Sequence, residues 1–390
     1  MTYDILTPSL ATLWPYKPTG PYAITRSFQT DIITSRNGTE QRRALRFTPR
    51  LSARYQTFIR NDQMSLAENR LKALQNAPAV IADHGRYVAM AAASAGATAI
   101  TITTPPAWIA EGQIIVLGCS DAVVVSGVSG STVSLDAPLG DAWADGTIVR
   151  PGLFGLLDGQ LRTDRIKPTA ATLSVSLQVY PGAEPPEDEG TATTFNGLEV
   201  FTFDPDWRAS PSLEYIYPVE QVDYGFGRTA QFRPIDRSQT LYEAEFAGLS
   251  PASAQAIEQV FLRAKGRRGE FYHSTCRPDM ALAADASGTS FTVRGTDIAS
   301  LFGSVDYSQV SQAIEIVQRN GTRVRRLVTD ISAGSGVSTI TVDSSVSLTT
   351  AGTARISWMP VVRFASDDLM TEWVTPRIAR IRAAFQSVRT

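Results

Sequence analysis

The chain has 390 residues, of which 43% are hydrophobic and 19% charged, which argues against a disordered protein and favours two or more globular domains. Its 36 Lys and Arg residues nearly balance 38 Asp and Glu residues, so a protein that mainly grips nucleic-acid phosphates is not expected. Two cysteines, Cys119 and Cys276, are too few for a disulfide framework and lack metal-site spacing.

The N-terminal segment 1–22 is predicted to be an extended arm, because prolines separate its aromatic residues Trp14, Tyr16 and Tyr22. Two positions for this arm are open: it packs on its own domain, or it packs on a neighbouring subunit. The segment has no basic stretch followed by an apolar one, and no 18-residue apolar run occurs in the chain. We therefore expect neither a signal peptide nor membrane insertion.

The first half is predicted to be a β module, residues 23–95 and 150–180, that carries one helix. Residues 65–77 favour a helix because Ser65 and Glu68 have capping-box spacing and Ala67, Leu71 and Leu74 form one stripe. Residues 96–149 consist of short β-branched runs separated by turn residues, as in QIIVLG and STVSLDAP. They are predicted to form an inserted small β-subdomain.

Residues 181–197 are rich in Pro, Glu and Gly and are predicted to be a linker between two halves. Their acidic run, Glu184–Glu189, is expected to be solvated. Binding of a basic partner or a divalent ion by this run stays open as the alternative.

The second half is predicted to repeat the plan of the first, with a module at 198–283 and 356–390 and an insert at 284–355. Residues 251–265 favour an amphipathic helix that starts at the N-cap Ser250 and ends at Gly266. The landmarks of the two halves occur in the same order, which favours a duplication. The matched pairs are Trp14 with Trp207, Pro18 with Pro211, Tyr22 with Tyr215, His84 with His273, Pro151 with Pro360, and Asp158 with Asp367.

The stretch KGRRGEFYH, Lys265–His273, is predicted to be the turn that leads from this helix back into the sheet. Positive charge at Arg267 and Arg268 suits a helix C-terminus, where it is favoured by ~0.3–1 kcal/mol. An exposed arginine pair on such a turn could also contact an acidic neighbouring subunit.

No motif in the sequence predicts catalysis or a cofactor. The chain has two histidines, His84 and His273, so an H-E-x-x-H metal site is impossible, and both are expected to be structural. The GVSGS segment around Ser129 is not the G-x-S-x-G nucleophile motif, and no phosphate-binding glycine loop occurs. We expect a non-enzyme with no catalytic, metal-binding or cofactor-binding residues.

Two blocks of the sequence resemble bacteriophage distal-tail and minor-tail proteins. They are VDYGFGRTAQF…LYEAEFAGLSPASAQAIEQVFLRAKGRRGEFYHSTC and its weaker counterpart EQRRALRFTPR…LAENRLKALQNAPAVIADH. The insert GQIIVLG…AVVVSGVSGSTVSLDAPLGDAWADGTIVRP is similar to small β modules of tail-tip proteins. The resemblance covers residues 22–165 and 215–375 in outline, and the double copy departs from the usual single-copy distal tail protein.

The resemblance implies duplicated tail-tube-like β-sandwich modules, each with one flanking helix, in a ring of three or six copies at the distal end of the tail tube. The implied partners are the tail tube, tape measure, hub and fibre proteins, with no direct nucleic-acid binding, in a virion tail assembled in the bacterial cytoplasm. Trp14, Tyr16, Tyr22, Arg267 and Arg268 are the interface candidates. Two other classes stay open: a carbohydrate-binding or receptor-binding tail protein, and a tail-associated cell-wall hydrolase.

Overall fold

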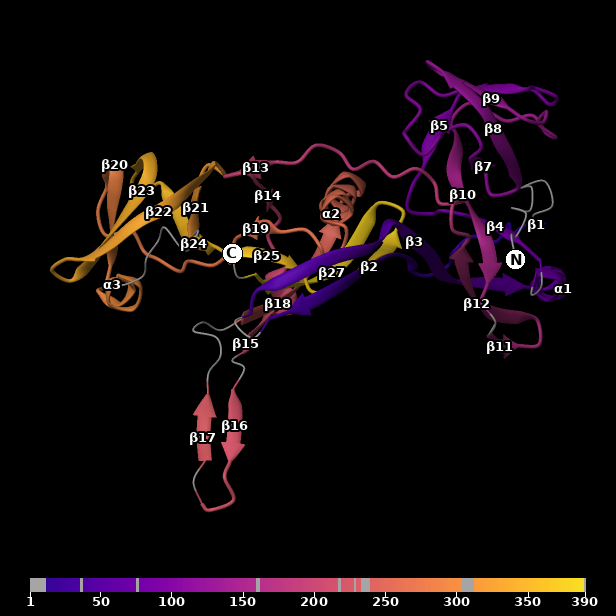
Figure 1. Ribbon diagram of the computed structural model, residues 1–390. Helices are drawn as coiled ribbons and strands as arrows, with labels where there is room; N and C mark the ends of the chain where they lie inside the picture. The colour runs from indigo at the N-terminus through magenta and orange to yellow at the C-terminus, as the bar shows by residue number, and fades with distance from the viewer. Residues whose placement is uncertain are drawn as a thin grey trace.

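The computed structural model describes residues 12–35, 38–74, 77–158, 162–216, 219–227, 229–232, 239–303 and 312–388. This part of the chain is mainly β, as expected, and contains three α-helices. The molecule is elongated in Figure 1, where a central sheet separates two small β-subdomains and a two-stranded hairpin projects from the body.

The first half supplies the following elements in chain order: β1 (Thr12–Leu13), β2 (Tyr22–Thr34), β3 (Glu40–Arg60), α1 (Asp62–Leu74), β4 (Ala79–Ala82), β5 (Val88–Met90), β6 (Ala99–Thr101), β7 (Ile114–Leu117), β8 (Asp121–Ser129), β9 (Thr132–Leu135), β10 (Thr147–Leu157), β11 (Thr163–Lys167) and β12 (Ala170–Val179).

The second half supplies β13 (Thr194–Phe195), β14 (Leu198–Phe201), a 3-10 turn at Trp207–Ala209, β15 (Ser212–Ile216), β16 (Glu220–Asp223), β17 (Thr229–Phe232), β18 (Gln239–Leu249), α2 (Pro251–Ala264), β19 (Phe271–His273), β20 (Ala286–Arg294), α3 (Asp297–Phe302), β21 (Ala313–Gln318), β22 (Arg323–Ala333), β23 (Val337–Leu348), β24 (Thr353–Met359), β25 (Val361–Phe364), β26 (Asp368–Thr375) and β27 (Ile378–Ser387).

The central sheet combines strands from both halves. Its antiparallel order is β15, β18, β27, β26, β2, β3, β12 and β11, and the pairing of β2 with β26 joins the halves. Alternate residues of β2, such as Tyr22 and Ile24, are buried in one core because side chains of a strand alternate between its two faces. The sheet is therefore continuous across the boundary between the halves.

Each half also has shorter strands that complete a second layer. In the first half β4 pairs in parallel with β1 and antiparallel with β10, and β10 pairs with the end of β12. In the second half β19 pairs in parallel with β14 and antiparallel with β25, and β25 pairs with the end of β27.

The two small β-subdomains have their own hydrophobic cores. One core draws on β5 to β10 and includes Met90, so it extends beyond the N-terminal bound of the predicted insert 96–149. The other draws on β20 to β24 and includes Met280 and Ile356, just outside the predicted insert 284–355. A helix that the sequence did not predict, α3, packs on this second core through Ala299.

Both expected helices form, with one boundary predicted wrongly. In α2 the Ser250 hydroxyl accepts a bond from the Ser253 backbone N–H at 3.2 Å, as the N-cap prediction requires. Helix α1 starts at Asp62 rather than Ser65, so the predicted Ser65–Glu68 capping box lies inside the helix. The buried stripe of Ala67, Leu71 and Leu74 is as predicted.

Candidate functional site

The contact between the two halves is the most extensive candidate interface in the molecule. Strand β2 pairs with β26 from Tyr22 opposite Trp373 to Ser27 opposite Asp368. The side chains of Tyr22, Ile24, Leu369 and Trp373 are all at most 6% exposed and belong to one core cluster. The ladder therefore combines backbone bonds with apolar burial, which together fix its register.

Beyond this ladder, the distal part of the β2–β3 hairpin lies over the second half of the chain. Phe28 packs on Phe261 of α2 with ring centroids 5.5 Å apart. The Asp367 carboxylate accepts bonds from the Thr30 backbone N–H at 2.7 Å and from the Thr30 hydroxyl at 2.8 Å. Lys265 lies 5.2 Å from the ring centroid of Phe47.

Two ion pairs also connect this hairpin to the second half. Arg363 is 2% exposed and binds both carboxylate oxygens of Glu40, at 2.8 and 2.9 Å. Arg42 pairs with Glu270 and donates to the Arg268 carbonyl at 3.0 Å. Burial alone would raise the pKa of Glu40, but the hydrogen bond and charge of Arg363 outweigh burial and lower it.

The KGRRGEFYH stretch receives the hairpin. Helix α2 ends at Ala264, and both Lys265 and Gly266 adopt the left-handed conformation, with φ of 53° and 67°. The Arg267 backbone N–H donates to Asp367 at 2.9 Å. The stretch is the predicted turn back into the sheet, and it contacts the β2–β3 hairpin of its own chain.

The two arginines of this stretch differ in exposure. Arg267 is half-buried and its Nε has no hydrogen-bond partner among the described residues. Arg268 is exposed, and its carbonyl, rather than its side chain, binds Arg42. Of the pair, Arg268 thus keeps a side chain available for a neighbouring subunit.

The arm residues lie against their own chain. Strand β1 pairs with β4, and Trp14 and Tyr22 are each 2% exposed within the central core. Tyr16 is half-buried, and its ring centroid lies 4.7 Å from that of Trp14. This corrects the assignment of Trp14 and Tyr22 as interface candidates, because side chains buried in their own fold cannot cover a neighbour. The assignment of Tyr16 stays a prediction. Residues 1–11 of the predicted arm lie outside the described residues.

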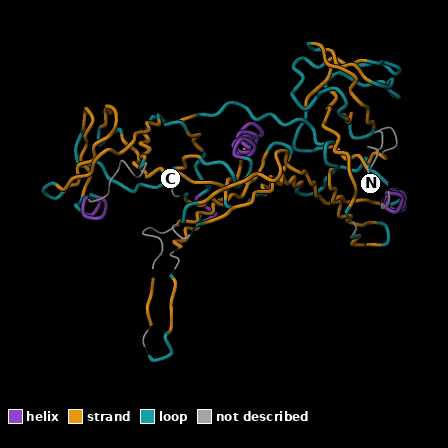
Figure 2. The backbone as a smooth tube through the Cα atoms, in the orientation of Figure 1, coloured by secondary structure: helices purple, strands orange, loops and turns teal. Residues whose placement is uncertain are grey.

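The linker is anchored by a buried cluster of charges. Figure 2 shows residues 181–193 as a long loop between the halves. Glu187 pairs with Arg86 and, at 3.1 Å, with Arg26, which also binds Glu258 of α2 at 2.7 Å. Burial alone would raise the pKa of Glu187, but the two arginine charges outweigh burial and lower it. This carboxylate of the acidic run is therefore an internal anchor rather than a solvated group.

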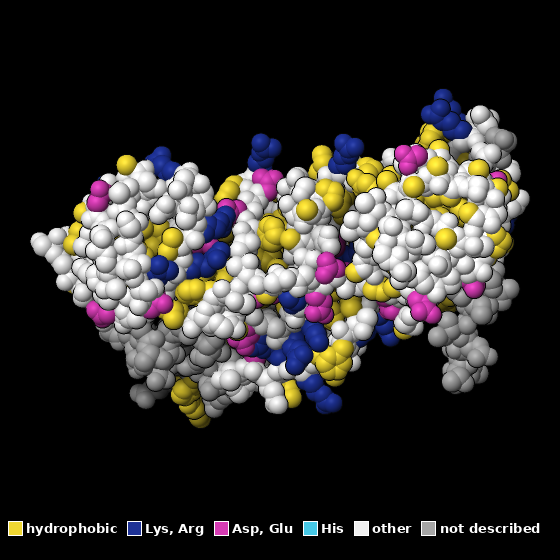
Figure 3. All heavy atoms as spheres, turned by 90° about the horizontal axis from the view of Figure 1, so that it is seen from above, with side chains coloured by type: hydrophobic (Ala, Val, Ile, Leu, Met, Phe, Trp, Pro, Cys, Tyr) yellow, Lys and Arg dark blue, Asp and Glu magenta, His cyan; other side chains and the backbone are white. Residues whose placement is uncertain are grey.

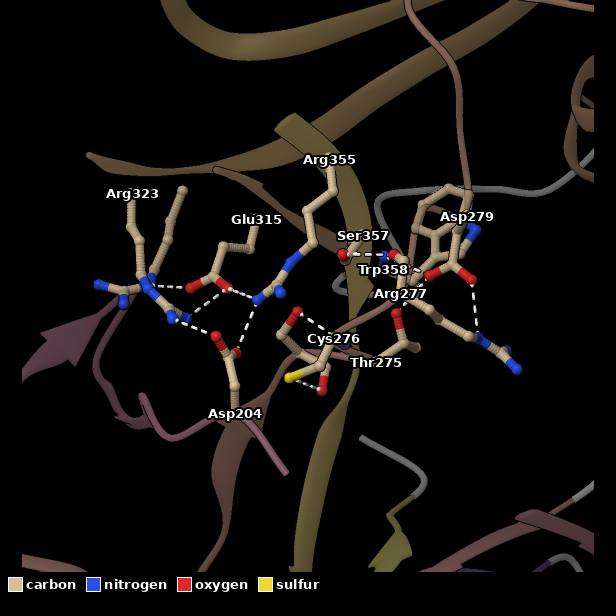
Figure 4. A network of polar contacts seen from close by, with 12 residues as sticks. Asp204, Thr275, Cys276, Arg277, Asp279, Glu315, Arg323, Arg355, Ser357 and Trp358 are labelled. Carbon is tan, nitrogen blue, oxygen red and sulfur yellow. Dashed lines mark hydrogen bonds and ion pairs between the residues drawn. The ribbon is translucent and has the colours of Figure 1, made fainter. Parts of the chain in front are cut away.

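A second polar network connects the β20–β24 subdomain to the loop that follows β14 (Figure 4). Glu315 is 1% exposed and pairs with Arg323 at 3.1 Å and with Arg325 at 3.3 Å. Asp204 pairs with Arg323 and Arg355, each at 2.7 Å. In the space-filling view, Lys and Arg side chains gather along the boundary between this subdomain and the body (Figure 3). Asp204 lies outside the subdomain, whereas Arg323 and Arg355 belong to it, so these ion pairs hold the subdomain against the rest of the chain.

The Cys276 thiol, which lies near this network, and the two histidines of the chain are poorly suited to acid–base work. Burial raises the pKa of the Cys276 thiol to about 12, so it stays protonated at neutral pH. Burial lowers the pKa of His273 to about 3, and the same cause lowers that of His84 to about 3. Both imidazoles are therefore neutral, and each packs among aromatic rings: His273 on Phe385 at 4.6 Å and His84 on Tyr22 at 5.6 Å.

Arg26, Arg42, Glu187 and Asp367 carry much of the junction, and sequence reasoning did not single out any of them as an interface residue. Their partners are far away along the chain: Arg26 and Glu258 are separated by 232 residues, and Thr30 and Asp367 by 337. In the sequence, Arg26 and Arg42 are single charges within strand-like runs, and Glu187 is part of the acidic run. Such charges are usually solvated, so the sequence did not indicate buried ion pairs.

Comparison with known family models and with curated proteins finds no match for this chain. Among the described residues, no group of His, Cys, Asp and Glu side chains has a geometry that could hold a metal ion. None of the helices in that part of the chain has the length and apolar character needed to cross a membrane.

Proposed function

We propose that this chain is a structural component of a bacteriophage tail tip, in which copies form a ring at the distal end of the tail tube. Each chain contributes two tail-type β modules, and the ring connects the tube to the hub and fibres. The sequence resemblance suggests the family. The β2–β26 junction is an example of how two such modules can join edge to edge.

The observation that carries the proposal is that the same order of strand pairing occurs in each half. The pairs β1–β4, β2–β3, β3–β12, β4–β10, β10–β12 and β11–β12 have counterparts in β14–β19, β15–β18, β18–β27, β19–β25, β25–β27 and β26–β27. The directions agree in every case, and α1 and α2 follow β3 and β18. This agreement supports a duplicated module.

Strand registers support the duplication at single residues. The β11–β12 ladder shifts at Ile166, just before the turn, and the β26–β27 ladder shifts at Val374 in the same place. The Asp158 N–H donates to the Ser176 carbonyl, and the Ala365 N–H donates to the Ala384 carbonyl. Asp158 therefore corresponds to Ala365, and not to Asp367 as the sequence landmarks suggested.

The histidine landmark changes for the same reason. Gly155 pairs with both Ala79 and Val179, and Val362 pairs with both Phe271 and Ser387. Ala79 thus corresponds to Phe271. Counting forward along each chain segment, His84 corresponds to Cys276 rather than to His273.

A ring suits a sheet of this kind because it leaves no strand edge unpaired. Three chains would supply six modules, and repetition of one head-to-tail contact closes the ring. The proposal includes no catalytic step, in keeping with neutral, buried histidines and a protonated Cys276 thiol.

A carbohydrate-binding role gains little support from the tryptophans. Trp14, Trp108 and Trp373 are at most 8% exposed, Trp143 and Trp358 are half-buried, and Trp207 is 53% exposed. A tryptophan sugar platform normally presents more than one exposed indole face, so the structural role is the better-supported candidate.

Electron microscopy of the purified protein tests the proposal. We expect rings with a central opening, and antibodies against the chain should label the distal end of tails in particles from the phage that encodes it. A monomer at micromolar concentration together with unlabelled tails would overturn the proposal.

A further inference from the structure

We propose that β15 of one copy pairs antiparallel with β11 of a second copy and thereby repeats, between chains, the β2–β26 ladder that joins the halves within a chain. The inference rests on the proposed ring function and deepens it, because it names the two surfaces that meet and their register.

The two strands lie at opposite ends of the central sheet. Within the described residues, β15 pairs only with β18, and β11 pairs only with β12. Both strands present exposed side chains, including Tyr215 at 55% and Ile166 at 63% exposure. Each therefore offers a row of backbone donors and acceptors to another chain.

The duplication makes these two edges equivalent to the strands already joined inside the chain. Strand β15 occupies in the second half the position that β2 occupies in the first, because each pairs with the long strand that precedes the helix. Strand β11 occupies the position of β26, because each forms a hairpin with the last strand of its half. The ladder within the chain joins β2 to β26. Their counterparts, β15 and β11, have no such ladder within the described residues.

The register of the new contact follows from the ladders. Ala23 connects through Arg54 to Ser176, and Ser212 connects through Glu243 to Ala384, which corresponds to Ser176. Ser212 is therefore the counterpart of Ala23, which makes Pro211 the counterpart of Tyr22 and replaces the landmark pairing of Tyr22 with Tyr215.

On the other strand, Asp164 is the counterpart of Glu372, since each lies at the same distance from the shift in its hairpin. Ala23 pairs with Glu372 in the chain, so Ser212 should pair with Asp164 of the next copy. The same step places Leu213 opposite Thr163 and Glu214 opposite Arg162.

Charge complementarity supports this register. Glu214 is exposed, and the Arg162 side chain is 77% exposed and pairs with Asp164 of its own chain at 2.9 Å. An ion pair this exposed contributes ~0–1 kcal/mol, so Arg162 can exchange it for Glu214 of a second copy. Opposite charges directly across an antiparallel ladder stabilise it. A shift by one residue would instead place Glu214 opposite Thr163 of β11, which carries no charge, whereas Arg162 lies immediately before β11.

The β16–β17 hairpin supports the same partner. It follows β15, as the distal part of β2 follows the ladder in the first half, and Figure 1 shows it projecting from the body. Its exposed apolar residues include Val222 at 42%, Tyr224 at 55% and Phe226 at 93%. The distal part of the β2–β3 hairpin packs on the second half of its own chain. By the same equivalence, the β16–β17 hairpin should pack on the first half of another copy.

Disulfide trapping tests the contact in the intact chain. The double variant Ser212→Cys with Asp164→Cys should, on mild oxidation, give covalent multimers that end in a closed trimer on non-reducing gels. Ala23→Cys with Glu372→Cys occupies the equivalent ladder position and should close within one chain. The native thiols, Cys119 and Cys276, are each 4% exposed, and either single variant controls for stray coupling by them.

A charge exchange tests the register independently. Glu214→Arg alone and Arg162→Glu alone should each weaken association by about two- to fivefold, and the combined variant should restore it. Absence of multimers from the Ser212–Asp164 variant, while the Ala23–Glu372 control closes, would overturn the inference.

The outcomes separate this inference from the proposed function. Rings in electron micrographs without trapping at these positions would overturn the β15–β11 contact and leave the tail role standing. Trapped multimers from a protein that is absent from tails would support the contact and remove the tail role.

Discussion

Single buried residues account for how the two halves are held together. Arg26 is 1% exposed and lies between Glu187 of the linker and Glu258 of α2. Buried charges are tolerated when they are paired and hydrogen-bonded, and Thr371 adds a further bond to Glu258 at 2.6 Å. The sequence predicted the apolar stripes of the two helices, but it could not predict these pairs, because strand register over such separations is a property of the fold.

His273 should make the protein less stable in mild acid. Its pKa is lowered to about 3 by burial, while the unfolded imidazole titrates near 6.5. The contribution to stability is therefore complete above pH 6.5 and declines as the pH falls toward 3, because the unfolded chain binds the proton more readily. Through His273 the protein should lose about 2 kcal/mol of its free energy of unfolding between pH 7 and pH 5, and His273→Phe should abolish this loss.

Denaturant unfolding at those two pH values checks this expectation. The phenyl ring suits the site, since His273 stacks on Phe385 and its Nε2 has no partner among the described residues. An unchanged pH dependence in the variant would show that His273 does not titrate as its burial implies.

Gly266 and Gly248 form a matched pair for testing the seat of the β2–β3 hairpin. Both have positive φ, at 67° and 66°, so alanine strains the backbone similarly at each. A Cβ at Gly266 would lie 2.5 Å from the Asp367 Oδ1 atom, whereas one at Gly248 would meet nothing within 4 Å. Gly248→Ala should cost about 1–2 kcal/mol, and Gly266→Ala about 1–3 kcal/mol more.

Thermal unfolding of both variants measures the difference. Equal losses of stability would mean that Asp367 moves aside freely, in which case its bonds to Thr30 do not hold the hairpin.

At the scale of elements, locally encoded features were predictable and long-range ones were not. Helix α2 follows its prediction closely because Ser250, Pro251 and the apolar stripe all act within a few residues. The two tryptophans that were matched as sequence landmarks are not equivalent in the structure. Trp14 is buried beside β4, where its counterpart by strand register is Phe201, whereas Trp207 lies in an exposed 3-10 turn. Their difference depends on packing partners that the local sequence does not contain.

The arm should stabilise its own monomer. Trp14→Ala should lower the free energy of unfolding by about 3–5 kcal/mol, because it removes a large side chain that is 2% exposed. Trp207→Ala is the matched control and should change stability by less than about 1 kcal/mol, since Trp207 is 53% exposed. Denaturation of the monomer followed by circular dichroism gives both values. A stable Trp14→Ala monomer that fails only in assembly would restore the arm as a subunit contact.

At the scale of the whole molecule, the small β-subdomains are separate packing units attached to one continuous sheet. The sequence predicted both inserts from their short strands and turns. It did not predict that β2 joins β26, since an edge pairing between distant strands leaves no periodic signal.

The second subdomain should lose protection independently of the central sheet. Ile340 is fully buried in the β20–β24 core, so Ile340→Ala should destabilise that subdomain by about 2–5 kcal/mol. Hydrogen exchange should then accelerate in β20 to β24 and remain unchanged in β2, β3 and β26. Faster exchange throughout the chain would show that the subdomain and the sheet unfold as one unit.

The β2–β26 ladder has a kinetic consequence, because its two strands belong to one tethered chain. Pairing within one chain does not depend on encounter between molecules, so this ladder forms in dilute protein as readily as in concentrated protein. Contacts between chains depend on encounter and therefore on how much protein has been made. The fold thus separates assembly into a step that is complete in every newly folded chain and a step that waits for the chain to accumulate.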